Sequence, residues 1–285
     1  MTNRPALPLI DDLDVAGKRV FVRCDLNVPV KDGEVGDDLR IRASVPTLER
    51  LLERGARLVA ASHLGRPKGK VVPELSLEPV ATRLSQYLGR DVAMAADVAG
   101  DSARDLCASD AEIVLLENLR FEPGEERNDP DLARGLAALA DAYVDDAFGA
   151  AHRAHASIVG VADRLPAAAG LLLADEVEKL ERLLHSPERP FVAVLGGAKV
   201  SDKLGVLANL IERVDALCVG GAMAFTLLVA RGEEIGRSLV EKDRIDEVRD
   251  VLEKARANDV DVLLPTDVVA ADAPDEDAAY ETVEL

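Results

Sequence analysis

The chain has 285 residues, of which 48% are hydrophobic and only 3% aromatic, and it contains no tryptophan. Its 53 acidic and 34 basic residues give a formal net charge of −19. This balance argues against nucleic acids and anionic membrane surfaces as partners, because both require a broad basic face on the protein.

The same numbers indicate the size class and the compartment. The length fits two domains. The acid excess is typical of a halophile-like surface, with an ordinary acidic cytosolic protein as the alternative. The cysteines are far apart and form neither a disulfide framework nor a metal spacing. No apolar signal core or membrane-spanning run is present, so we expect a cytoplasmic protein. We also expect a monomer.

Short apolar runs alternate with amphipathic stretches along the chain. The runs predict strands at residues 19–23, 57–61, 113–116, 142–144, 191–195, 216–219 and 262–264. Several are apolar at consecutive positions, as in strands buried on both faces of a parallel sheet. The amphipathic stretches predict helices at residues 46–54, 77–88, 204–213 and 241–257. This order predicts an α/β fold with two Rossmann-like, doubly wound parallel sheets.

Residues 175–185 predict a charged helix, and two prolines follow it in residues 186–190. Because such a segment breaks regular structure, we place the domain boundary there. The expected domains are residues 1–174 and 190–285, with residues 175–189 as interdomain helix and hinge. The pattern fades after Asp267, so the second domain is expected to be incomplete.

Basic residues of the first half follow predicted strands or enter predicted helices. The clearest case is residues 63–70, a glycine-punctuated cationic loop in a stretch without acids from Arg54 to Pro73. Since the carboxyl ends of parallel strands share one edge, several such residues could surround one anion. They are Arg40, His63, Arg66, Arg120 and Arg153. The alternative for each arginine is a surface ion pair, and for each histidine a neutral hydrogen-bonding ring.

Two further features of the sequence are candidate ligand sites. Asp145-Asp146 lacks a third ligand, so a strand-end or helix-start role is favoured and no metal residue is expected. In the second half, Gly196-Gly197 and Gly220-Gly221 each follow a predicted strand and permit close backbone approach to a phosphate. Lys199 and Lys203 would share a helix face if the helix began early. The spacing differs from a Walker A loop.

Several motifs together resemble one family, the phosphoglycerate kinases. They are RCDLNVP at residues 23–29, RIR at 40–42, SHLGRPKG at 62–69, ENLRF at 117–121, AHRAHAS at 151–157, GGAKVSDK at 196–203 and, more weakly, PTDVVA at 265–270. They occur in the family's order across nearly the whole chain.

The resemblance implies reversible phosphoryl transfer between 1,3-bisphosphoglycerate and ADP, giving 3-phosphoglycerate and ATP, with Mg²⁺ and closure of two domains. The implied catalytic residues are Arg40 and Lys199. The implied substrate-binding residues are Asp25, Leu26, Asn27, Arg40, His63, Leu64, Gly65, Arg66, Arg120 and Arg153. The implied nucleotide-binding residues are Gly196, Gly197, Lys199, Lys203, Gly220 and Gly221.

Departures from the family pattern leave alternatives open. Ala222 replaces the third glycine of a glycine turn. The family's tryptophan-containing segment, its Mg²⁺-binding aspartate loop and its returning C-terminal segment are not found, so a truncated sequence is expected. The alternatives to the kinase are a phosphoglycerate-binding chain with little or no turnover, and a different α/β enzyme for sugar phosphates or nucleotides.

Overall fold

The computed structural model describes residues 7–273, 275 and 278–285. The chain divides into two compact units after Leu180. This division falls inside helix α6 (Leu171–His185), which begins four residues before the helix expected at 175–185. Each unit is described below by itself.

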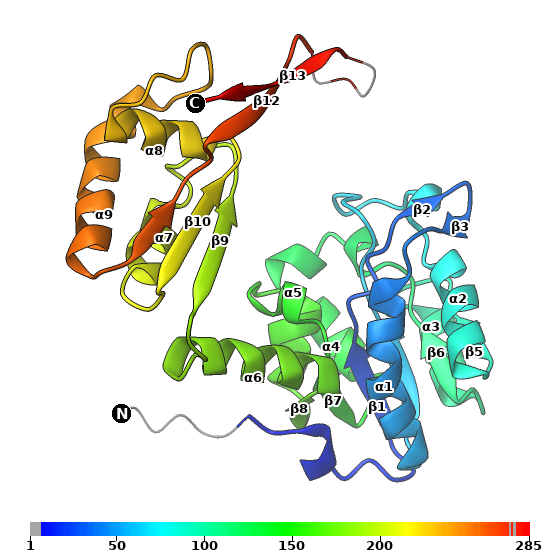
Figure 1. Cartoon of the computed structure of the whole chain (residues 1–285). Helices are drawn as coiled ribbons and strands as arrows, with labels where there is room; N and C mark the ends of the chain where they lie inside the picture. Colours follow the sequence, from blue (N-terminus) through cyan, green and yellow to red (C-terminus); the bar gives the residue numbers. More distant parts are fainter. Residues whose placement is uncertain (1–6, 274, 276–277) are drawn as a thin grey trace. The chain divides into compact units, whose positions relative to one another are not determined.

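Unit 1 contains a six-stranded parallel sheet in the order β5-β6-β4-β1-β7-β8 (Figure 1). Its strands are β1 (Arg19–Arg23), β4 (Arg57–Ala61), β5 (Val92–Met94), β6 (Ile113–Leu115), β7 (Ala142–Asp145) and β8 (Ala167–Ala169). The order reverses at β1, since β4 pairs with one side of β1 and β7 with the other. A doubly wound parallel fold was predicted, and it is confirmed.

Both faces of this sheet are covered by helices, as the continuous apolar run of β1 indicated. Val20 and Val22 belong to one core cluster, which α1 and α2 complete. Phe21, between them, belongs to the opposite cluster with residues of α3 and α4, and its ring stacks on Tyr143 at a centroid distance of 5.9 Å. The helices of unit 1 before α6 are α1 (Leu39–Glu53), α2 (Glu78–Leu88), α3 (Asp101–Ala108), α4 (Pro130–Ala137) and α5 (Phe148–Ala151).

Unit 2 has a smaller parallel sheet in the order β11-β10-β9. Its strands are β9 (Val192–Gly196), β10 (Ala216–Gly220) and β11 (Asp261–Leu263), and its helices are α7 (Leu204–Leu210), α8 (Met223–Arg231) and α9 (Ile245–Ala257). These elements pack around one apolar core, which contains Leu207, Leu217, Leu227 and Val248. In register, Gly196 lies opposite Gly220, so the two glycine turns leave the sheet side by side.

Some elements differ from the prediction. Helix α1 begins seven residues before the expected start and includes Pro46. The short strands β5 and β8 were not predicted, nor were the hairpins β2–β3 (Val30–Lys31, Glu34–Val35) and β12–β13 (Asp267–Ala271, Tyr280–Glu284). The last hairpin lies after the point near Asp267 where the expected alternation of strands and helices fades. No helix in the described ranges is long and apolar enough to cross a membrane.

Candidate functional site

A hollow of about 240 Å³ opens at the carboxyl edge of the sheet in unit 1. Parallel strands β6, β4, β1 and β7 are adjacent, so the segments that follow them meet at this edge. The lining residues are Asp25, Asn27, Arg40, His63, Gly65, Arg66, Arg120, Gly149, Ala150 and Arg153. All five basic residues expected to surround one anion are among them.

Each lining side chain comes from a segment that the sheet positions. Asp25 and Asn27 follow β1, and His63 to Arg66 follow β4. Arg120 lies in a short helical turn after β6, and Arg153 lies just beyond α5, which follows β7. Arg40 enters from the first turn of α1. The site therefore collects residues that are up to 128 positions apart in the sequence.

The loop after β4 is held by buried amide contacts. Asn118, fully buried, accepts hydrogen bonds from the backbone nitrogens of Leu64 and Arg120 and donates to the carbonyls of Leu64 and Leu75. The Gly65 nitrogen donates to Asn27 Oδ1 at 2.9 Å, and Arg120 Nη1 donates to the Gly65 carbonyl at 2.7 Å. The ligand-facing loop is thus fixed from below before any ligand binds.

The hollow is strongly cationic. Four arginines line it against a single carboxylate, Asp25, whose Oδ2 pairs with Arg40 Nη1 at 2.8 Å. Burial together with the neighbouring charges of Arg23, Arg120 and Arg153 lowers the pKa of His63 to about 2, so its ring is neutral. This arrangement attracts a small, multiply charged anion.

Two residues assigned to substrate binding by resemblance lie elsewhere. Leu26 and Leu64 are buried in the apolar core of unit 1, and they do not line the hollow. Their contribution is through the backbone, since Leu26 N donates to Ser62 Oγ and Leu64 N to Asn118. Leucine side chains cannot bind an anion, so the core placement follows from their chemistry.

Sequence reasoning did not single out Arg23 as a site residue. This side chain is almost fully buried at the end of β1, and its Nη2 lies 3.1 Å from His63 Nδ1. The available signal was a charged residue closing a strand that is buried on both faces, because an arginine there requires polar partners.

The pair Asp145-Asp146 acts within the fold. Asp145 Oδ1 accepts from the Ala147 nitrogen at 2.9 Å. Asp146, fully buried, accepts from the nitrogens of Leu172 and Leu173 in the first turn of α6. Across the residues described, no three His, Cys, Asp or Glu side chains gather as a metal site.

In unit 2 the glycine turns pack against each other. Gly221 has a positive φ of 67°, and a Cβ there would lie 2.8 Å from the Gly197 carbonyl oxygen. The Met223 nitrogen donates to that same oxygen at 2.9 Å. The neighbouring Ala222 has ordinary helical angles of −62° and −25°, so the replacement of the family's glycine needs no special backbone conformation.

Lys199 and Lys203, which follow the Gly196-Gly197 turn, do not lie on a helix. Helix α7 begins at Leu204, so Lys199 and Lys203 both precede it, which corrects the early start considered above. The loop that carries them is held by Glu241, whose carboxylate accepts from Ser201 N at 3.0 Å and from Ser201 Oγ at 2.6 Å. The lysine ammonium groups and the backbone N–H groups of the glycines are hydrogen-bond donors, and donors of both kinds can bind nucleotide phosphates.

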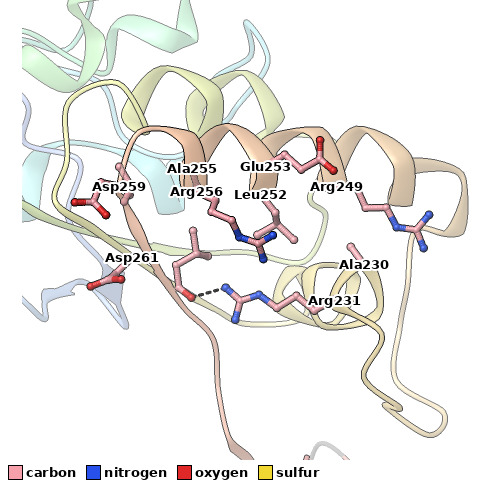
Figure 2. A pocket seen from close by; sticks show the side chains of 11 residues that line it. Ala230, Arg231, Arg249, Leu252, Glu253, Ala255, Arg256, Asp259 and Asp261 are labelled. Carbon is pink, nitrogen blue, oxygen red and sulfur yellow. Dashed lines mark hydrogen bonds between the residues drawn. The ribbon is translucent and has the colours of Figure 1, made fainter.

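A second hollow, of about 520 Å³, lies between α8, α9 and β11 in unit 2 (Figure 2). It contains none of the predicted site residues. Arg231 and Arg256 stand in the last turns of α8 and α9, where cations complement the carbonyl ends of helices, and Arg231 donates to the Val262 carbonyl (Figure 2). Arg249 also lines this hollow, and the three arginines are balanced by three carboxylates, those of Glu253, Asp259 and Asp261. This hollow is therefore no counterpart of the cationic site.

Comparison with known proteins agrees with the motifs. A family model described as phosphoglycerate kinase matches residues 10–285. The chain belongs to the phosphoglycerate kinase family. It is 54% identical over 267 residues to the phosphoglycerate kinase of Pelotomaculum thermopropionicum, covering 93% of this chain and 68% of that protein. It is 57% identical over 264 residues to that of Thermomicrobium roseum, covering 92% and 67%.

A solved structure supports the fold. The phosphoglycerate kinase of Coxiella burnetii matches with a TM-score of 0.82 and 43% identity, over 98% of this chain and 71% of that one. The function is accordingly that of a glycolytic phosphoglycerate kinase, which transfers a phosphoryl group reversibly between 1,3-bisphosphoglycerate and ADP. The family uses ATP or ADP with Mg²⁺. The chain spans about two thirds of the length of these two relatives.

Proposed function

We propose that the hollow in unit 1 is the phosphoglycerate site of this kinase. The observation that carries the proposal is the convergence of Arg40, Arg66, Arg120 and Arg153 around a space with a single carboxylate. In a chain with a net charge of −19, such a local excess of positive charge indicates a site for an anionic ligand. A three-carbon acid carrying a phosphate supplies two anionic groups for these arginines.

The size of the hollow supports a small ligand. Its volume of about 240 Å³ lies below the roughly 300–1,000 Å³ of pockets for drug-sized molecules. A phosphorylated glycerate is a small ligand, whereas a nucleotide is of drug size. The nucleotide is therefore assigned to the glycine turns of unit 2, with Gly196, Gly197, Gly220 and Gly221 giving backbone access and Lys199 and Lys203 meeting its phosphates.

The lining groups divide by chemistry. Asp25 and Asn27 suit the hydroxyl end of the glycerate, while Arg66, Arg120, Arg153 and the neutral His63 suit its anionic groups. Arg40 is held by Asp25 at the rim and is the candidate to stabilise the phosphoryl group in transfer, with Lys199 on the nucleotide side. Phosphoryl transfer depends mainly on positioning and charge neutralisation, so no covalent intermediate on the protein is needed.

We also propose a hinge, a cellular setting and an oligomeric state for this chain. Residues 175–189 are proposed as interdomain helix and hinge, supported by the division between units inside α6. A salt-rich setting is supported by the acid excess. A cytoplasmic setting is supported by the three unpaired cysteines. Among the described acidic side chains, only Glu125 and Asp146 are buried, so the remaining carboxylates lie at least partly in solvent. We also propose that the chain is monomeric, because its high net charge opposes self-association.

Calorimetric titration of the chain with 3-phosphoglycerate tests the assignment of the hollow. We expect binding, and we expect Arg66→Ala to weaken it by about 10- to 100-fold, as for a charge-assisted hydrogen bond of 1.5–3 kcal/mol. Arg104→Ala is the matched control, because Arg104 is an exposed arginine of unit 1 paired with Asp101 away from the hollow. Absence of binding, or equal loss in both variants, would contradict the proposal.

A further inference from the structure

A buried chain of polar groups runs beneath the phosphoglycerate hollow, from Glu125 through Ser157 and Arg23 to His63. Glu125 and Ser157 are fully buried, Arg23 is 1% exposed, and His63 reaches the hollow. Ser157 Oγ lies 2.6 Å from Glu125 Oε1, Arg23 Nε lies 2.9 Å from Ser157 Oγ, and Arg23 Nη2 lies 3.1 Å from His63 Nδ1. Each link is within hydrogen-bond distance.

The charge of Glu125 sets the direction of the first link. Burial raises the pKa of Glu125, but His155, Arg23 and the hydrogen bonds from Ser157 outweigh it, and the net shift is downward. The group is thus an ionised carboxylate, which only accepts hydrogen bonds. It accepts from both Ser157 N, at 3.0 Å, and Ser157 Oγ. The single hydroxyl proton of Ser157 is committed to Glu125, and its lone pairs are left for Arg23.

Arginine sets the direction of the remaining links. A guanidinium has donors and no acceptor, so Arg23 donates to Ser157 Oγ through Nε and to His63 Nδ1 through Nη2. His63 Nδ1 is therefore an acceptor and carries no proton. Since the ring is neutral, its proton is on Nε2.

We infer that Glu125 is a positioning residue for the phosphoglycerate site, acting through Ser157 and Arg23 to hold His63 as the Nε2–H tautomer. In this form the ring offers a donor, rather than a lone pair, to the anion in the hollow. The opposite tautomer would place an acceptor lone pair against anionic oxygen. The part of the inference that concerns ligand binding rests on the proposed function, and the part that concerns the ring does not.

A merely structural role for Glu125 makes a different prediction. If the carboxylate only fills and stabilises the interior, its replacement lowers the stability of unit 1 and leaves the tautomer of His63 unchanged. If it orders the chain of hydrogen bonds, its replacement changes the ring itself. Glu125→Gln removes the negative charge that faces the Arg23 guanidinium, so Arg23 is no longer held against Ser157 Oγ and His63 Nδ1.

The experiment is a two-bond proton–nitrogen correlation spectrum of the ligand-free chain labelled with ¹⁵N-histidine. We expect Nδ1 of His63 to be pyridine-like and Nε2 to carry the proton, with His63→Gln assigning the signals. Glu125→Gln should give a mixture of tautomers and an affinity for 3-phosphoglycerate about 10-fold lower. Glu112→Gln, which alters an exposed ion pair with Arg90, should change neither.

Ser157→Ala provides a second route if Glu125→Gln folds poorly, because it breaks the same chain without placing a new amide in the core. The same change in the ring is expected. A proton on Nδ1 in the unaltered chain overturns the inference, as does an unchanged ring in both variants. If 3-phosphoglycerate does not bind the unaltered chain, the proposed function fails, and the ring spectra still decide the inference.

Discussion

Asn118 and Leu64 are joined by two hydrogen bonds that fix the loop at the hollow of unit 1. Asn118 Oδ1 accepts from Leu64 N at 3.2 Å, and Asn118 Nδ2 donates to the Leu64 carbonyl at 2.8 Å. One side chain from the segment after β6 thus satisfies the backbone of the segment after β4. Because backbone groups buried without partners are costly, this amide determines the shape of the loop.

Asn118→Ala is expected to lower the free energy of unfolding by about 3 kcal/mol, since it leaves buried backbone groups of Leu64, Leu75 and Arg120 without partners. Urea denaturation followed by circular dichroism measures the change. Asn209→Ala is the control, because Asn209 is exposed and its side chain donates to the Gly205 carbonyl within α7. A loss for Asn118→Ala no larger than that of the control would show that the loop keeps its shape by other means.

Arg40→Ala should reduce the rate of phosphoryl transfer by about 10²–10³-fold, the magnitude found when a donor to developing charge is removed. Its effect on unfolding should stay within about 1 kcal/mol, because the Arg40 side chain is half exposed and its pair with Asp25 is in contact with solvent. Arg42→Ala is closely matched, since Arg42 lies on the same helix, has similar exposure and pairs with Asp38. A coupled ATP-formation assay on both variants distinguishes them, and equal activities would remove Arg40 from the catalytic group.

Much of the site was predictable because it depends on topology rather than on side-chain packing. The apolar run 19–23 and the run 57–61 matched β1 and β4, and parallel strands bring their carboxyl ends to one edge. Residues following those strands had to converge there. The buried support was not predictable in this way. Nothing local to Glu125 or Ser157 indicates that they meet across 32 residues beneath the hollow.

The elements that were missed carry weak local signals. Strand β8 is three alanines, which have no strand preference of their own and are ordered by pairing with β7. Strand β5 spans only three residues at the sheet edge. Helix α1 begins seven residues before the expected start at Pro46, and this proline lies inside the helix. Tertiary packing decides each of these cases.

Gly221→Ala should destabilise unit 2 by about 2 kcal/mol, because alanine is strained at a φ of 67° and its Cβ would approach the Gly197 carbonyl to 2.8 Å. Gly220→Ala is the neighbouring control for stability, since a Cβ there meets nothing within 4 Å. Hydrogen exchange of the α8 and β10 amides measures both. Equal protection in the two variants would show that the glycine turns tolerate a side chain.

Added salt should stabilise the chain. Raising NaCl from 0.1 to 1 M shortens the screening length from about 10 Å to about 3 Å and weakens the self-repulsion of 19 excess negative charges. The melting temperature should rise on the order of 5 °C, where about 2 kcal/mol corresponds to several degrees for a chain of this size. Since the same screening weakens surface ion pairs, a falling melting temperature would show that ion pairs dominate and would contradict the halophile proposal.

Asp146 should make stability depend on pH. Burial raises its pKa to about 7, against hydrogen bonds with Thr47 and with the first turn of α6. The ordinary pKa of the unfolded carboxyl is 3.8, so between these values the folded chain binds more protons and loses stability as pH rises. The full difference corresponds to about 4 kcal/mol.

Urea denaturation at pH 4 and pH 8 measures this effect. Between these two pH values, the free energy of unfolding of Asp146→Asn should rise by that amount relative to the unaltered chain. Asp131→Asn, at an exposed site, should gain nothing, and parallel pH profiles for all three proteins would refute the assignment.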